Sequence, residues 1–196
     1  MPPGETALLP GNPWVARRKL SVAEYHRMGE AGILTEDDRV ELIEGELIAM
    51  SPIGSDHSGT VNSLTRLLVL AVGDRGVVAV QNPVRLDDYS EPQPDFAVLK
   101  PRADDYRRAT PVPADVLLIV EVADSSLAYD RTVKRALYAS HGIPEFWIVN
   151  LGAGAVEVHR QPRGAQYESV SRVGRGGMLE PALLPGIAIP VAALLG

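Results

Sequence analysis

The chain has 196 residues, of which 45% are hydrophobic and 22% are charged, and these values are typical of one globular domain and exclude a disordered or fibrous chain. The absence of cysteine excludes disulfides, thiolate metal sites and cysteine nucleophiles, and it fits a reducing compartment. A formal net charge of −6 counts against simple non-specific binding of nucleic acid, but it leaves a metal-dependent nuclease open because bound cations offset clustered carboxylates.

The N-terminal segment carries no targeting pattern. It does not join a basic stretch to an apolar core, and no apolar run of the chain is long enough to span a bilayer. We therefore expect a soluble, cytoplasmic protein. Residues 1–19 are rich in proline and glycine without periodicity, which predicts an N-terminal arm and leaves residues 20–196 as a single domain.

The start of this domain predicts a helix followed by a β-hairpin. Ser21 and Glu24 have the spacing of a capping box, which indicates that a short helix follows. Residues 39–50, RVELIEGELIAM, contain two β-prone runs on either side of Glu44-Gly45, and these runs predict two strands joined by a tight turn.

The central part predicts one helix and four strands. Apolar residues recur at helical spacing over residues 61–72, and Ser55 or Asp56 is the expected cap of that helix. Strands are expected at residues 77–80, 84–86, 94–99 and 115–122. The last of these, DVLLIVEV, is nearly all apolar, which is typical of a central strand buried on both faces.

The rest of the chain predicts a loop, a helix and three more strands. A polar, proline-rich loop covers residues 101–114, and a helix over residues 130–140 ends before Gly142. Strands are expected at residues 146–149, 155–160 and 167–170. The order of elements indicates a mixed sheet with helices on its faces. The apolar segment after Leu183 either completes the core or offers a surface to a partner.

Two carboxylates stand near the ends of predicted strands. Asp95 lies near the start of one strand, and Glu121 lies near the end of a strand otherwise made of Val, Ile and Leu, where an ionised side chain is costly to bury without a partner. If the strands are neighbours, both acids point into one pocket, and two hard oxygen ligands with room for water suit Mg²⁺ or Mn²⁺. Two alternatives stay open: Asp95 forms a turn after its proline, and Glu121 makes a structural ion pair with an arginine.

Three polar residues follow one face of the helix after the Glu121 strand. Asp130, Lys134 and Tyr138 are spaced i, i+4, i+8. If this helix follows the strand closely, Lys134 reaches over the metal pocket, where it stabilises charge on a phosphorane or orients the attacking water. The alternative is an exposed ion pair of Asp130 with Lys134, worth about 0.3–0.5 kcal/mol.

Three further candidates carry a weaker signal. His57 at a helix start is either a capping or surface histidine or a catalytic one, and Glu41 and Glu44 are either hairpin residues or ligands. The motifs of phosphate-loop enzymes, dinucleotide-binding enzymes, nucleophile-elbow hydrolases and HExxH zinc proteases are all absent from the sequence. These common enzyme classes therefore fit the sequence poorly.

The candidate residues lie in segments that resemble the Uma-type endonuclease family of the PD-(D/E)XK, restriction-endonuclease-like superfamily. The segments are RVELIEGELIAMSP with the following His57, QPDFAVL, and LLIVEVADSSLAYDRTVKRALYASHGIPEFWIV. The resemblance covers residues 20–160. It implies an α/β fold with a restriction-endonuclease-like mixed β-sheet flanked by α-helices, preceded by an N-terminal helix and a β-hairpin. It also implies a Mg²⁺- or Mn²⁺-dependent endonuclease that hydrolyses phosphodiester bonds in DNA, and a homodimer.

The same resemblance implies roles for individual residues. Asp95 is the acid of the "PD" half-motif and Glu121 is the second acid. The superfamily usually places its lysine two residues after that acid, where this chain has Ala123, so Lys134 on the next helix resembles a migrated lysine. The implied accessory residues are Glu41, Glu44, His57, Gln93, Asp130 and Tyr138.

A second hypothesis belongs to another class of protein. The fold can serve as a non-catalytic nucleic-acid-binding or assembly module in which the acids make structural ion pairs, because a fold does not fix a function. The presence of a basic groove around the acids would favour the endonuclease, because DNA binding needs contacts to phosphates. The arginines expected to form that groove are Arg102, Arg107, Arg108, Arg131 and Arg135.

Overall fold

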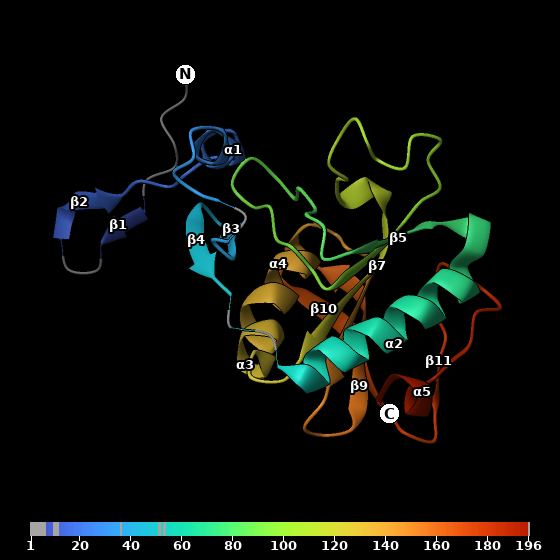
Figure 1. Ribbon diagram of the computed structural model, residues 1–196. Helices are drawn as coiled ribbons and strands as arrows, with labels where there is room; N and C mark the ends of the chain where they lie inside the picture. Colours follow the sequence, from blue (N-terminus) through green and yellow to red (C-terminus); the bar gives the residue numbers. More distant parts are fainter. Residues whose placement is uncertain (1–6, 10–11, 36, 51, 53, 196) are drawn as a thin grey trace. The chain divides into compact units, whose positions relative to one another are not determined.

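A computed structural model describes residues 7–9, 12–35, 37–50, 52 and 54–195 (Figure 1). The described residues form two compact units, one within residues 1–51 and 85–92 and the other within residues 52–84 and 93–196. The expectation of a single domain over residues 20–196 stays a prediction. None of the helices that the structure describes has the length and apolar character that crossing a bilayer requires.

The first unit contains two short strands within residues 1–19, where the sequence predicted an N-terminal arm. Strands β1 (Ala7–Leu9) and β2 (Asn12–Arg17) pair antiparallel. These strands were not predicted, because backbone pairing between two short segments does not require apolar periodicity. The expectation of an N-terminal arm over residues 1–19 stays a prediction.

The predicted helix and hairpin of the first unit are confirmed. Helix α1 (Val22–Glu30) begins after a complete capping box between Ser21 and Glu24. Strands β3 (Val40–Ile43) and β4 (Glu46–Ala49) pair around a turn in which Glu44 and Gly45 have φ angles of 49° and 80°. A Cβ on Gly45 would also lie 2.5 Å from the Lys19 side chain, so this turn requires glycine.

Residues 84–86, which were expected to form a strand, have no strand structure. The Leu86 N–H donates to the carbonyl of Ser90 at 2.9 Å and closes a local turn. A backbone group used in this way cannot join a ladder, so the prediction of a strand here is wrong.

The second unit is built on a six-stranded mixed sheet in the order β10-β9-β8-β7-β6-β5. All neighbours pair antiparallel except β7 and β8, which are parallel. The strands are β5 (Val77–Val80), β6 (Phe96–Leu99), β7 (Val116–Ala123), β8 (Glu145–Asn150), β9 (Ala155–Arg163) and β10 (Gln166–Gly174). All eight residues of β7 are buried, as expected for a central strand.

A helical crossover joins the two parallel strands, because parallel neighbours cannot be joined by a tight turn. It consists of α3 (Leu127–Tyr129), a π-helical turn (Asp130–Lys134) and α4 (Arg135–Ser140). Gly142 follows with a φ of 70°, which fits its predicted place after the helix end. The mixed sheet with flanking helices confirms the predicted fold class (Figure 1).

Successive side chains along β7 point to opposite faces of the sheet. Val120 and Val122 belong to the main apolar core together with residues of helix α2 (Ser55–Val72), whereas Glu121 points to the opposite face. The N-cap of α2 is Gly54, without a side-chain hydrogen bond, so the expectation that Ser55 or Asp56 caps this helix is wrong. Both residues instead lie within its first turn.

The C-terminal segment completes the main core. Short strands β11 (Met178–Leu179) and β12 (Ile189–Pro190) pair, and α5 (Val191–Leu195) follows. The core includes six apolar residues of this region, namely Leu179, Leu184, Ile187, Ile189, Val191 and Leu194. Of the two alternatives for the apolar segment after Leu183, the structure thus shows the first.

A buried glutamate connects this segment to the sheet. Glu145 is fully buried at the start of β8, and it accepts hydrogen bonds from Trp147 Nε1 at 2.6 Å, Arg160 Nε at 2.9 Å and the Ala182 backbone N–H at 2.7 Å. Such a carboxylate is tolerated because donors surround it.

The face of the sheet to which Glu121 points carries an aromatic cluster around a buried histidine. The ring of His159 on β9 stacks on Phe146 with centroids 5.7 Å apart and lies 5.8 Å from Tyr167. His159 is only 2% exposed. Burial lowers the pKa of its imidazole, and this effect outweighs the nearby carboxylate of Glu157.

We predict that Glu145→Leu lowers the free energy of unfolding by about 3 kcal/mol, because several buried donors lose their acceptor. Glu145→Gln should lose less, since its amide oxygen still accepts. The control is Glu168→Gln on the exposed ion pair with Arg163, which should change stability by less than about 0.5 kcal/mol. Urea unfolding measures all three variants, and equal stability of Glu145→Leu and wild type would contradict the prediction.

We further predict a pH dependence from His159. Its folded-state pKa lies below the ordinary value of 6.5, so the unfolded chain binds the proton more readily and the stabilisation is lost as the pH falls below that value. The decline in unfolding free energy between pH 7.5 and 5.5 should therefore be smaller in His159→Phe than in wild type. Urea titrations at both pH values test this, and identical declines would show that the histidine does not contribute.

Candidate metal centre

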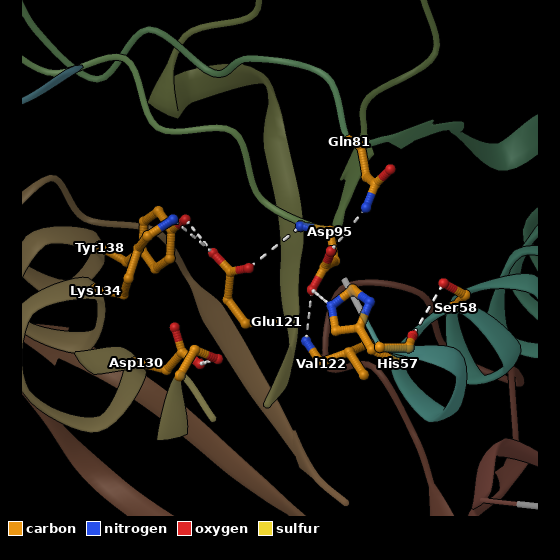
Figure 2. Close-up of polar contacts among 11 residues, drawn as sticks. His57, Ser58, Gln81, Asp95, Glu121, Val122, Asp130, Lys134 and Tyr138 are labelled. Carbon is orange, nitrogen blue, oxygen red and sulfur yellow. Dashed lines mark hydrogen bonds and ion pairs between the residues drawn. The ribbon is translucent and has the colours of Figure 1, made fainter. Parts of the chain in front are cut away.

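The two candidate acids meet at one edge of the sheet of the second unit. Phe96 on β6 pairs with Val120 on β7, which brings the preceding Asp95 beside the following Glu121. The Asp95 N–H donates to Glu121 Oε2 at 3.2 Å (Figure 2). The expectation that these two strands are neighbours is confirmed.

The Asp95 carboxylate is held by donors from three separate elements. Oδ2 accepts the backbone N–H of Val122 at 2.8 Å and lies 3.1 Å from His57 Nε2, while Oδ1 accepts the side-chain amide of Gln81 at 3.2 Å (Figure 2). His57 comes from the first helical turns of α2, and its side chain is 15% exposed. The structure therefore shows neither a simple turn-forming role for Asp95 nor a freely exposed His57.

The Glu121 carboxylate is paired with a lysine and a tyrosine. Its Oε1 accepts a hydrogen bond from Tyr138 OH at 2.7 Å and lies 3.2 Å from Lys134 Nζ. The side chains of Glu121 and Lys134 are only 8% and 6% exposed. The alternative of an ion pair between Glu121 and an arginine is not what the structure shows, because the cation here is a lysine.

The crossover helix places these partners. Asp130, Lys134 and Tyr138 are all buried, so the predicted shared face is observed, and the alternative of an exposed pair of Asp130 with Lys134 is wrong. The helix begins at Leu127 rather than Asp130, and Ser126 Oγ donates to Asp130 Oδ2 at 2.7 Å. The residues from Asp130 to Lys134 form a π-helical turn, a rare geometry that occurs frequently at functional sites.

Two glutamines complete the surroundings of Asp95. Gln93, which was expected to shape the site, donates through its side-chain amide to the backbone carbonyl of Gln81. Gln81 follows β5 and was not predicted. A glutamine after a strand carries no signal in the sequence, because its contact with Asp95 arises only when β5 pairs with β6.

Glu41 and Glu44 lie in the first unit. Glu41 is 3% exposed on β3, whereas Glu44 is exposed in the hairpin turn. The hairpin location of both residues is as expected, and their role as accessory acids stays a prediction.

The expected basic groove is not formed by the arginines of the loop after β6. Asp95 precedes β6 and the loop follows it, so Arg102 stands beyond the far end of a strand that spans about 13 Å. Arg102 also lines a surface hollow with Gly73 and Asp74 at the C-terminal end of α2, while His57 lies near the start of this helix of about 27 Å. The expectation of a groove that contains Arg102, Arg107 and Arg108 is therefore wrong, because the antiparallel pairing of β6 with β7 carries their loop to the other end.

Of the two remaining arginines, Arg131 differs from the expectation, whereas the place of Arg135 in a basic groove stays a prediction. Arg131 Nε lies 3.1 Å from both carboxylate oxygens of Glu157, and this bonding lowers the pKa of that glutamate. Arg135 is half-buried, and its charge acts on His159. Arg131 is thus neutralised within the protein rather than held ready for a phosphate.

The acids fit a hard divalent cation by the chemistry of their donors. Asp95 Oδ1, which accepts the Gln81 amide, and Glu121 Oε2, which accepts the Asp95 N–H, are carboxylate oxygens, and these are the hard donors that Mg²⁺ and Mn²⁺ prefer. Within the described parts of the chain, no three His, Asp or Glu side chains lie close enough to hold a metal ion together. Such a donor set suits Mg²⁺ or Mn²⁺, which bind through one or two carboxylates and keep water or substrate oxygens as further ligands.

The fold and this pair of acids define an α/β protein with a carboxylate centre at the edge of a mixed sheet. Residues 22–192 match the family Uma2, described as "Putative restriction endonuclease", and the chain belongs to this family. A similar solved structure is a "putative nuclease belonging to DUF820" from Anabaena variabilis, with a TM-score of 0.71 and 15% identity over 90% of this chain and 97% of that one. At this identity the likeness shows the fold. No curated protein sequence matches the chain significantly.

We predict that Lys134→Met lowers the free energy of unfolding by about 3 kcal/mol, because the buried Glu121 carboxylate loses its cation. In the double variant with Glu121→Gln, the loss should be smaller than the sum of the two single losses, since a neutral amide does not need the lysine. Denaturant unfolding of the four proteins completes this cycle. Strictly additive losses would contradict an energetic coupling between the two side chains.

Proposed function

We propose that this protein is a Mg²⁺- or Mn²⁺-dependent endonuclease that hydrolyses phosphodiester bonds in DNA. The observation that carries the proposal is the convergence of Asp95, Glu121 and Lys134 at one edge of the sheet. Two adjacent acids with a lysine from the next helix are the set that the resemblance to the PD-(D/E)XK superfamily implies for a nuclease. Membership of a family described as "Putative restriction endonuclease", together with the fold shared with a structure titled "putative nuclease", supports the same reaction class.

Asp95 and Glu121 would hold the metal ion. When bound there, the ion supplies polarisation of the phosphate and lowers the pKa of a water molecule. The chain's own residues fix the two ligands: the Val122 N–H and His57 orient Asp95, and Tyr138 orients Glu121. Loss of a group that holds a ligand in this way typically lowers metal affinity by about 10- to 100-fold.

Lys134 would stabilise charge. Its ammonium group lies beside Glu121 in a buried environment, where electrostatic interactions are stronger than in water. A fixed positive charge at this place favours the pentavalent phosphorus species, whose oxygens gain negative charge, or it orients the attacking water. The leaving group would be the 3′-oxygen.

Three parts of this proposal concern the surroundings of the enzyme. DNA is the proposed substrate, a homodimer is the proposed assembly, and the cytoplasm is the proposed location. A dimer would offer two centres for two strands. Light scattering coupled to size-exclusion chromatography determines the mass, and a monomer at micromolar concentration would argue against this assembly.

A non-catalytic binding or assembly module is the second candidate. The observation in its favour is that internal donors engage each carboxylate oxygen of the two acids, as in a structural hydrogen-bond network. The displaced arginine loop and the net charge of −6 point the same way.

We predict that the wild-type protein nicks supercoiled plasmid DNA with Mn²⁺ or Mg²⁺ and that Asp95→Asn and Glu121→Gln abolish this activity. The reason is that each substitution removes the negative charge of one of the two carboxylates proposed to hold the ion. Gel electrophoresis of the plasmid forms measures the reaction, and EDTA serves as the metal-free control.

Two results of the plasmid assay would contradict the prediction, and each has a different interpretation. Activity that persists in both variants would indicate a contaminating nuclease and refute the assignment of the acids. Inactivity of the wild type on plasmid and on single-stranded DNA, with both metal ions, would favour the binding module.

A further inference from the structure

Gln81 has an unusual backbone conformation next to the candidate centre. Its φ angle is +51°, in the left-handed region that residues with a Cβ rarely adopt. Glycine adopts this conformation without strain. A glutamine here therefore indicates that the side chain serves a purpose, because an observed backbone outlier is grounds for a functional hypothesis.

The contacts of Gln81 converge on the segment that carries Asp95. Its backbone N–H donates to the Asp95 carbonyl at 3.0 Å, and its own carbonyl accepts the side-chain amide of Gln93. Its side-chain amide donates to Asp95 Oδ1 at 3.2 Å, as Figure 2 shows. Main chain and side chain thus both engage the residues that lead into β6.

The bond from Gln81 fixes the oxygen of Asp95 that has spare acceptor capacity. Oδ2 is engaged by Val122 and His57, whereas among the residues that the structure describes Oδ1 receives one hydrogen bond, from the Gln81 amide. Donors at both oxygens define the plane of the carboxylate. An amide is also neutral, so it orients this oxygen without adding the positive charge by which a lysine or arginine would repel a cation.

We propose that Gln81 is a positioning residue that fixes the Asp95 carboxylate for a divalent cation at Oδ1. This inference rests on the proposed function, because it takes Asp95 as a ligand. The residue acts through Asp95 and is not itself a ligand. Its left-handed backbone is the strain that this positioning requires.

The test compares Gln81→Gly with wild type by titration of Mn²⁺ alone, in a calorimeter and without nucleic acid. Glycine removes the amide and relieves the strained φ angle. We expect Mn²⁺ affinity to fall about tenfold or more, as is typical when a group that orients a metal ligand is lost. The melting temperature should stay the same or rise. A purely structural role would lower stability rather than produce these opposite changes.

Gln161 provides a matched control. It is an exposed glutamine on β9 with a φ of 60°, and Gln161→Gly relieves the same kind of strain without contact to Asp95. This variant should bind Mn²⁺ as wild type does. Gln81→Asn is the second variant, because asparagine tolerates the left-handed region while its shorter side chain draws the amide away from Oδ1.

The outcomes separate the two proposals. If wild type binds Mn²⁺ and either Gln81 variant, folded, binds it equally well, the positioning role is overturned and the metal centre stands. If wild type binds no more Mn²⁺ than Asp95→Asn, the metal centre itself fails, and the role of Gln81 fails with it. Loss of affinity in both Gln81 variants but not in Gln161→Gly supports the inference.

Discussion

A charged glutamate on a strand that is buried on both faces is the constraint on which the candidate centre depends. Glu121 cannot remain ionised in such a place without partners, because burying an uncompensated carboxylate is costly. The crossover helix supplies a cation and a hydroxyl at Oε1, and the start of β6 supplies a backbone N–H at Oε2. The three elements around Glu121 are therefore tied to one another by the need to satisfy a single side chain.

Glu145 is a second buried carboxylate in this sheet, but its partners differ from those of Glu121. Glu145 on β8 is also fully buried, but the groups around it include Trp147, Arg160 and the backbone of the C-terminal segment. Those contacts connect the sheet to the segment that completes the core. Glu145 is surrounded by hydrogen-bond donors and therefore has a structural role. Glu121, in contrast, lies beside a second carboxylate, that of Asp95. Adjacent carboxylates repel unless cations offset them, which is the physical reason to assign chemistry to one site and stability to the other.

The candidate centre also combines rigid and strained features. Asp95 is held from β5, α2 and β7 at once, and Lys134 ends a π-helical turn. The left-handed Gln81 and the π-helical turn both depart from regular geometry within the same part of the fold. Irregular backbone persists where the surrounding structure determines it, and such places are enriched at sites that bind ligands.

Much of the fold could be predicted from the sequence, because local patterns carry it. The capping box at Ser21, the Glu44-Gly45 turn and the apolar run of β7 each depend on neighbours in the chain, and each is observed. The strand expected at residues 84–86 is not formed, and strands β1 and β2 were not predicted, because backbone pairing rather than a local pattern decides these segments.

The sequence by itself determined the residue types of the centre: two acids at strand ends and a polar helix face with Lys134. Only the tertiary structure decided which groups meet them. The antiparallel pairing of β6 with β7 brought Asp95 to Glu121 and carried the arginine loop away, and the pairing of β5 with β6 brought in Gln81. The physical reason is that strand register and backbone conformation, which no short sequence pattern encodes, set the distances over which hydrogen bonds and charges act.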